Sequence, residues 1–161
     1  MSEQNLWSIL DEVKDPEIPV ISLVDLGVVR NAVLENGNPI VTITPTYSGC
    51  PAMSVMEEDI EMRLKVAGYK SIKIETVLSP AWTTDWISQE GRNALEKYGI
   101  APPLDADADK DALLGNKKIV KCTNCGSQNT KLVSQFGSTA CKALFKCEDC
   151  QEPFDYFKCL K

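Results

Sequence analysis

Apolar residues recur at two distinct spacings along the first hundred residues. A spacing of three or four predicts helices over about 5–13, 52–67 and 84–98. Alternation and runs of β-branched residues predict strands over about 28–34, 40–44 and 71–78. The order helix, strand, strand, helix, strand, helix indicates the α+β class: a small α/β sandwich in which helices cover one sheet.

Turn and cap residues indicate where these elements end. Pro16 disfavours helical backbone in the residue before it, so the first helix ends near Asp15. The Asn36-Gly37 pair between two strands is typical of a tight hairpin. Pro51 suits the first turn of the second helix, and Gly68 is a typical C-terminal stop for it.

The composition changes after residue 100. Residues 101–116, APPLDADADKDALLGN, combine two prolines with an acidic tract and show no consistent apolar period. They predict a linker between an N-terminal domain of residues 1–100 and a C-terminal module of residues 117–161. Within the module, residues 132–136 and 140–146 suit two strands of a ribbon.

Four cysteines in this module follow a metal-binding spacing. Two Cys-x2-Cys pairs are separated by 21 residues, and their members are Cys122, Cys125, Cys147 and Cys150. The two intervening residues of each pair bring both sulfurs onto one ion, so the double pair predicts one structural zinc ion per chain. A module this small buries too little apolar surface to fold alone, and metal ligation supplies the missing stabilisation.

Other interpretations of the module stay open. The same four thiolates accept iron, which would make a rubredoxin-like electron carrier, and four unliganded buried cysteines are the other alternative. Cys141 and Cys159 lie outside the pairs and are expected in the ribbon core, although either could replace a ligand. Three aromatic residues are expected to pack over the metal: Phe154, Tyr156 and Phe157.

Composition excludes several classes of function. The chain has 161 residues, seven cysteines and no histidine, which excludes Ser-His-Asp and Cys-His nucleophile systems and histidine-ligated catalytic zinc. Residues 1–116 carry 19 Asp+Glu against 9 Lys+Arg, whereas residues 117–161 carry 4 against 8, so nucleic-acid binding by the whole chain is disfavoured. We expect a cytoplasmic protein without membrane contact, because the sequence shows neither an apolar stretch of roughly 20 residues nor a secretory signal pattern. Disulfides are disfavoured in that reducing compartment.

Cys50 lies directly before the second predicted helix, in the sequence Ser48-Gly49-Cys50-Pro51. Unpaired amides and the macrodipole at a helix start favour an anion, so a thiol there tends toward a lowered pKa and becomes a better nucleophile or soft-metal ligand. The alternative is a cysteine that only packs at the helix start. For Asp15 and Glu17, the residues by themselves favour capping and turn roles.

Several motifs together resemble a known family. They are DPEIP, SLVDLG, PTYSGCPAM, SPAWTTDWI, GIAPP, CTNCG and CEDCQEPFDYFKC. Over essentially the entire chain they resemble PaaD-type (also called PaaJ) phenylacetate-degradation proteins, and the first hundred residues separately resemble the SufT-like, or MIP-type, family that assists iron-sulfur cluster assembly. The resemblance implies that Cys50, Asp15 and Glu17 are candidates for cluster or metal transfer.

The resemblance also implies a function: an accessory, maturation protein of the phenylacetyl-CoA epoxidase system, a multicomponent ring-oxygenating monooxygenase of aerobic phenylacetate degradation. The oxygenase or reductase component is the implied partner. We add the hypothesis that Cys50 transiently ligates an iron-sulfur cluster, with a homodimer whose two protomers the cluster bridges as one form. The sequence lacks Glu-x-x-His ligands and a dinucleotide fingerprint, so we expect the chain to be neither the oxygenase nor the reductase, and we expect no catalytic residue and no activity of its own. A small thiol-dependent enzyme that uses Cys50 is a further alternative, but the sequence offers no base to activate the thiol. The alternative is a non-catalytic structural adaptor of the oxygenase complex in which Cys50 is inert.

Overall fold

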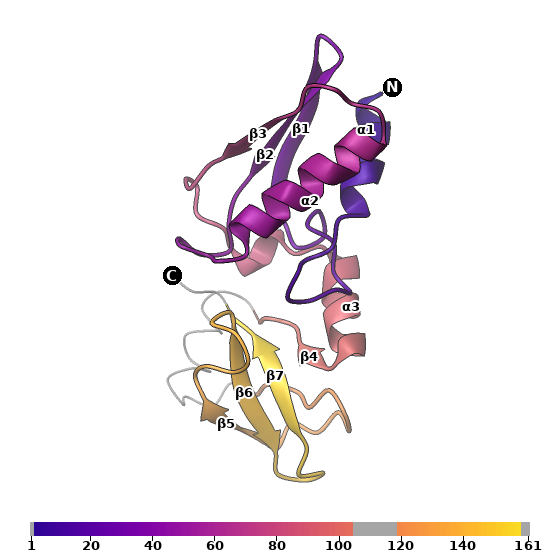
Figure 1. Cartoon of the computed structure of the whole chain (residues 1–161). Coiled ribbons are helices and arrows are strands. Elements are labelled where there is room, and N and C mark those ends of the chain that lie inside the picture. The colour runs from indigo at the N-terminus through magenta and orange to yellow at the C-terminus, as the bar shows by residue number, and fades with distance from the viewer. Residues whose placement is uncertain (1, 105–118, 159–161) are drawn as a thin grey trace. The chain divides into compact units, whose positions relative to one another are not determined.

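The computed structural model describes residues 2–104 and 119–158 and contains two compact units (Figure 1). The first unit comprises the described residues up to Trp82 together with Trp86–Gly91. The second comprises Thr83–Asp85 and the described residues from Arg92 onward. The chain enters the second unit briefly at Thr83–Asp85, returns to the first, and passes into the second again at Arg92, within helix α3 (Gln89–Tyr98).

The first unit contains a three-stranded mixed sheet in the order β1-β2-β3. Strands β1 (Val29–Glu35) and β2 (Asn38–Ile43) are antiparallel, and β3 (Lys73–Thr76) pairs in parallel with β2. The turn between β1 and β2 has positive φ at Asn36 (51°) and Gly37 (80°), which is the left-handed backbone that the Asn-Gly signal predicts. The predicted hairpin and the predicted order of elements are confirmed.

Two helices supply the apolar side of the sandwich. Helix α1 (Glu3–Asp11) begins after Ser2, whose side chain accepts a hydrogen bond from the amide of Asn5 at 3.3 Å. Helix α2 (Met53–Val66) buries one stripe of side chains at a spacing of four, namely Met56, Ile60 and Leu64. Figure 1 shows α2 running across the sheet, so this stripe is the face that excludes water from the core.

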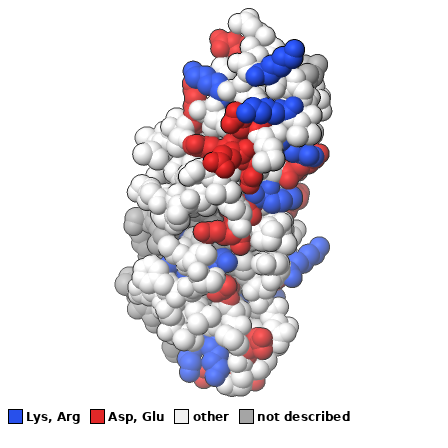
Figure 2. Space-filling model, viewed as in Figure 1, with Lys and Arg blue, Asp and Glu red and all other residues white. Residues whose placement is uncertain are grey.

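The exposed side of α2 is charged with both signs. Glu61 pairs with Lys65 at 2.6 Å, and Arg63 pairs with Glu12 at the end of α1. Figure 2 shows acidic and basic side chains interleaved over this part of the molecule. This face therefore presents no uniform positive field to a phosphate backbone.

The last predicted helix is shorter than the sequence pattern indicated. A 3-10 turn η1 (Thr84–Trp86) precedes α3, so the prediction of one helix over 84–98 is wrong at its N-terminal part. The reason is Ser88, whose hydroxyl oxygen accepts the amide of Gly91 at 2.9 Å. A serine that bonds the amide three residues later is an N-cap, and its own backbone lies outside the helix.

The second unit is a four-stranded sheet in the order β4-β7-β6-β5. Strands β5 (Thr130–Ser134) and β6 (Lys142–Cys147) correspond to the two predicted ribbon strands. The sequence analysis missed β7 (Pro153–Phe157) and the short β4 (Ile100–Ala101), which pairs in parallel with β7. Phe154 and Tyr156 of β7 pack in the core with Phe145.

The expected linker falls mostly outside the described residues. Residues 105–116 are not described, so the prediction of a linker there is not tested. Its first residues belong to the second unit: Ala101 pairs with Tyr156, and the amide of Leu104 donates to the hydroxyl of Tyr156 at 3.1 Å. Within residues 2–104 and 119–158, no helix is both long enough and apolar enough to cross a membrane.

Candidate metal centre

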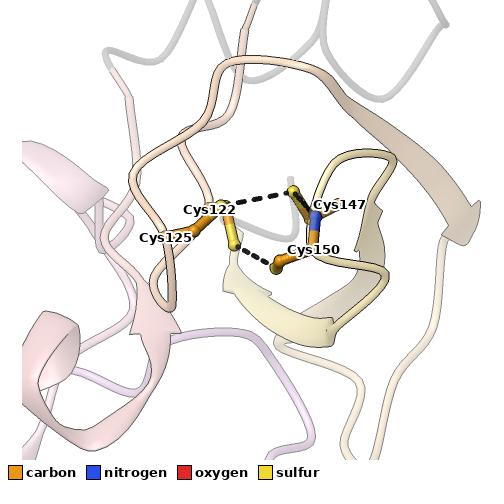
Figure 3. A group of neighbouring side chains, drawn as sticks. All are labelled: Cys122, Cys125, Cys147 and Cys150. Carbon is orange, nitrogen blue, oxygen red and sulfur yellow. Dashed lines mark hydrogen bonds between the residues drawn. The ribbon is translucent and has the colours of Figure 1, made fainter.

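The two Cys-x2-Cys pairs are brought together at one end of the second unit. Cys122 and Cys125 lie in a turn ahead of β5, whereas Cys147 ends β6 and Cys150 lies in the turn before β7. Their four sulfur atoms all lie within 4.8 Å of one another. Figure 3 shows the four side chains converging from the two turns on a common centre.

Backbone geometry holds each pair in a tight turn, which we call a knuckle. In the first knuckle, Gly126 has φ 75° and its amide donates to the carbonyl of Cys122 at 3.0 Å. In the second, the equivalent residue after the last cysteine is Gln151, with φ 64°. Its side-chain amide donates to the carbonyl of Glu148 at 2.6 Å, a local contact that helps a non-glycine residue to occupy left-handed backbone.

The spacing of the sulfurs fits one tetrahedral ion. The Cys122 and Cys150 sulfurs lie 3.8 Å apart, and the Cys125 and Cys147 sulfurs 3.6 Å apart. Four sulfurs at about 2.3 Å from a central ion form a tetrahedron with edges of about 3.8 Å. A donor set of four thiolates with no open position is typical of structural zinc, and iron accepts the same ligands.

The pKa values of Cys125 and Cys150 are shifted in opposite directions. The backbone amide of Glu152 and the side chain of Asn124 hydrogen-bond to Cys150 and lower the pKa of its thiol to about 7. For Cys125, the amide of Ser127 lowers the pKa, but loss of water around the thiol on the side that faces the other three cysteines, together with hydrogen bonding to them, outweighs it and raises the pKa to about 12. A divalent cation removes this conflict, because its charge allows all four sulfurs to be thiolates at once.

One side of the site is buried and the other faces solvent. Cys122 and Cys147 are 3% and 0% exposed and belong to the same apolar core as Phe145, Phe154 and Tyr156. Cys125 is exposed and Cys150 is partly exposed. The aromatic residues therefore pack beside the buried ligands, while a path from solvent to the exposed ligands stays open.

The remaining cysteines of the module do not join the cluster as far as the structure describes them. Cys141 is buried, and its sulfur lies 3.1 Å from the hydroxyl of Thr139. Cys159 lies outside the described residues. Among the described residues, the cluster of four is the one group of three or more acidic or cysteine side chains close enough to hold an ion.

Cys50 lies in the loop before α2 and is partly exposed. Its amide donates to the carbonyl of Tyr47 at 3.3 Å, and its carbonyl accepts the amide of Met53 at 3.3 Å, so two successive turns fix its backbone. Gly49 has φ 80°, and the space where a side chain would project is open within 4 Å. No side chain caps the start of α2, and its first turn carries no acidic residue.

Asp15 is committed to the local turn. It is 6% exposed, and one carboxylate oxygen accepts the amides of Glu17 and Ile18, each at 2.8 Å. This is the Asx-turn role that the residue types favour. The described residues contain no cluster in which Asp15, Glu17 and Cys50 all lie within ligand distance of one another, whereas the four cysteines of the second unit do form such a cluster.

Sequence reasoning missed the polar residues that link the two knuckles. Asp149 accepts hydrogen bonds from Ser127 and Asn129, and Asn124 donates to the sulfur of Cys150. The signal that was available is that both positions between the cysteines of each pair are polar. Such residues are common in exposed turns, so only the folded geometry distinguishes their partners.

The two parts of the chain match two described families. Residues 3–76 match the family described as iron-sulfur cluster assembly protein. Residues 106–158 match the PaaD zinc beta ribbon domain, which contains the four clustered cysteines.

Two relatives and one solved structure show how far each likeness extends. The chain is 44% identical over 155 residues to an Escherichia coli (strain K12) protein whose name proposes it as a component of 1,2-phenylacetyl-CoA epoxidase; the match covers 96% of this chain and 92% of that protein. It is 38% identical to an Fe-S protein maturation auxiliary factor of Porphyromonas gingivalis (strain ATCC BAA-308 / W83), covering 55% of this chain and 86% of that protein. The crystal structure of a DUF59 domain of unknown function from Bacillus anthracis matches with a TM-score of 0.54 and 30% identity, over 58% of this chain and 90% of that one.

Proposed function

Because the chain belongs to the PaaD-like family, in which an iron-sulfur cluster assembly domain is followed by a PaaD zinc ribbon, we propose that it is an accessory maturation protein of a phenylacetyl-CoA epoxidase system. In this proposal Cys50 binds iron or an iron-sulfur cluster as cargo and passes it to a partner component. The client is the oxygenase or reductase component, and the protein has no chemical reaction of its own.

The observation that carries this proposal is the accessibility of Cys50. A thiol sealed in the core could not meet a metal, whereas this one is partly exposed and lies beside an open glycine position. The uncapped start of α2 leaves backbone amides that favour an anionic ligand such as a thiolate-bound cluster. One cysteine ligand from each chain suits transfer of a cluster better than storage, since a stably held cluster takes four protein ligands.

A homodimer would supply a second Cys50 to a bridging cluster. This arrangement fits the ligand count, because two chains provide two thiolates, fewer than the four of a stably held cluster, and exchange of both for ligands of the client transfers the cargo. We propose it as the loaded form.

The ribbon has a different role in the proposal. Zinc held by Cys122, Cys125, Cys147 and Cys150 would join the two knuckles and stabilise the second unit. The chain's own contribution is to place four sulfurs at tetrahedral spacing and to bury two of them against the aromatic core. We assign this ion to structure and the ion at Cys50 to transfer.

Anaerobic reconstitution tests the role of Cys50. Zinc-loaded protein is incubated with iron and sulfide, and acid-labile sulfide and visible absorbance are measured for wild type, Cys50→Ala and the loop control Ser48→Ala. We expect cluster uptake by wild type and Ser48→Ala and its loss in Cys50→Ala. Equal uptake by all three proteins would remove Cys50 from the mechanism.

A gene deletion separates maturation from a purely structural adaptor role. The oxygenase and reductase are purified from cells that lack this protein, and their metal content and assembly are measured. Low metal occupancy in an intact complex supports maturation. Full occupancy together with loss of complex integrity supports the adaptor with an inert Cys50.

A further inference from the structure

Each cysteine knuckle sends one side chain to the other knuckle. Asn124, between Cys122 and Cys125, donates from Nδ2 to the sulfur of Cys150 at 3.6 Å. Asp149, between Cys147 and Cys150, reaches in the opposite direction to residues that follow the first knuckle. The two contacts are reciprocal, and both join segments that are far apart in the sequence.

Asp149 uses both oxygens of its carboxylate in this contact. Oδ1 accepts the side-chain amide of Asn129 at 2.8 Å, and Oδ2 accepts the hydroxyl of Ser127. The hydroxyl oxygen of Ser127 in turn accepts the backbone amide of Asn129 at 3.0 Å. The carbonyl of Asn129 accepts the amide of Glu148 at 2.8 Å, so side-chain and backbone bonds link the same two segments.

These contacts set the distance between the sulfurs of one knuckle and those of the other, which neither knuckle sets by itself. The turn of each knuckle sets the spacing of its own two sulfurs, through bonds such as that from Gly126 to Cys122. The spacing of sulfurs from different knuckles depends on how the two turns are held together. The cross-knuckle sulfur pairs, at 3.6 and 3.8 Å, are the ones that match the edge of a four-sulfur tetrahedron.

We propose that Asp149 is a positioning residue of the metal centre, which holds the two knuckles at the separation where four sulfurs share one ion and thereby slows loss of that ion. Asp149 is not one of the four clustered ligands, and its two oxygens accept hydrogen bonds from Ser127 and Asn129. The site needs such a contact because Cys125 is exposed, so water and chelators can reach the ion on that side. Outer residues that orient metal ligands typically contribute about 10–100-fold to metal affinity, and Asp149 acts at this level through the segment that follows the first knuckle.

The test measures zinc release from the full-length protein. Zinc-loaded wild type, Asp149→Ala and Asp149→Asn are mixed with 4-(2-pyridylazo)resorcinol, and the rate of colour formation is followed. The matched control is Glu96→Ala, which removes the same charge from an exposed position on α3 in the second unit. We expect release to be about tenfold or more faster in Asp149→Ala and to keep the wild-type rate in Glu96→Ala. Asp149→Asn keeps one acceptor oxygen and should fall between the two.

A spectroscopic measurement distinguishes positioning from a general loss of stability. Cobalt(II) replaces zinc, and its d–d absorption reports the symmetry of the four sulfurs. The proposal requires a changed spectrum in Asp149→Ala and an unchanged one in Glu96→Ala. Wild-type release and spectrum in Asp149→Ala, or equal acceleration in both variants, would overturn it.

A milder variant keeps the proposal testable if Asp149→Ala does not fold. Asn129→Ala removes the bond to Oδ1 and leaves Ser127 in place. Faster zinc release from this variant supports the proposal, and release at the wild-type rate contradicts it. Neither result depends on cluster binding at Cys50, so failure here leaves the proposed function untouched.

Discussion

Asp25 and Ser88 form a hydrogen bond of 2.6 Å in which the serine hydroxyl donates to the carboxylate. The contact joins the loop before β1 to the residue that precedes α3, and the backbone amide of Ser88 also donates to the carbonyl of Asp25 at 2.8 Å. The same serine oxygen caps α3 by accepting the amide of Gly91. The start of α3 is thus set by a residue 63 positions earlier in the chain.

Replacing this serine should destabilise the protein. Ser88→Ala removes both the helix cap and the bond to Asp25, and loss of an N-cap typically costs about 1 kcal/mol. We expect the free energy of unfolding in urea to fall by about that amount or slightly more. Ser54→Ala is the control, because Ser54 is exposed in the first turn of α2 and makes no capping bond. Equal effects of the two substitutions would contradict the assignment of Ser88 as a cap.

Gly27 should tolerate no side chain. It has φ 79°, and a Cβ built there would lie 2.7 Å from both the Cβ and the carbonyl oxygen of Trp86. Gly27→Ala therefore combines left-handed strain with a clash, and we expect a loss of more than roughly 2 kcal/mol in the free energy of unfolding. Gly37→Ala is the matched control, since Gly37 has φ 80° and open space around it. That control should show only the strain, about 1–2 kcal/mol. Unfolding in urea, followed by tryptophan fluorescence, measures both.

Removing the metal should unfold the second unit and spare the sheet of the first. The core that holds Cys122 and Cys147 is small, and without an ion the two pairs of cysteines lose the ligand bonds that would join them. Hydrogen exchange measured after chelation should show loss of protection in β5, β6 and β7, with protection retained in β1 and β2. Unchanged protection in β5–β7 would show that the ribbon folds without metal.

Two lysines should titrate on opposite sides of the ordinary lysine pKa of 10.5. Burial lowers the pKa of Lys158, partly offset by the nearby Cys141, whereas a hydrogen bond and charge from Glu75 raise the pKa of Lys73. Folded Lys158 binds fewer protons than the unfolded chain between its lowered pKa and 10.5, so its contribution to stability rises with pH there. The Lys73 contribution is present below 10.5 and is lost as pH rises through its raised pKa.

Lysine side-chain NMR measures both midpoints directly. Glu75→Gln should lower the midpoint of Lys73 and leave that of Lys158 unchanged. Coincident midpoints for the two lysines in wild type would contradict this prediction.

Local signals in the sequence were sufficient wherever neighbouring residues decide the structure. Asn36-Gly37 predicted the hairpin, because both residues tolerate positive φ without help from the rest of the chain. The spacing of Met56, Ile60 and Leu64 predicted α2, because apolar residues four positions apart lie on one face of a helix and pack there against the core. The cysteine spacing predicted the cluster in the second unit, because two residues between the cysteines of each pair let both sulfurs reach one ion.

The remaining features depend on residues distant in sequence. Strand β7 was missed because its aromatic run also suits a cover over the metal, and only pairing with β6 makes it a strand. The start of α3 depends on Asp25, and the second knuckle uses Gln151 where the first uses glycine. The contacts of Asp149 likewise require two knuckles that are already side by side.

The pairing of β4 with β7 determines where the chain can be cut. A fragment that begins at residue 117 would lack Ile100 and Ala101, which bond along one side of β7. That side would then expose unpaired amide and carbonyl groups next to Tyr156, and open strand edges of this kind recruit other chains. A soluble fragment for study of the ribbon alone should therefore begin before Arg92, and shorter fragments are expected to aggregate even when fully loaded with metal.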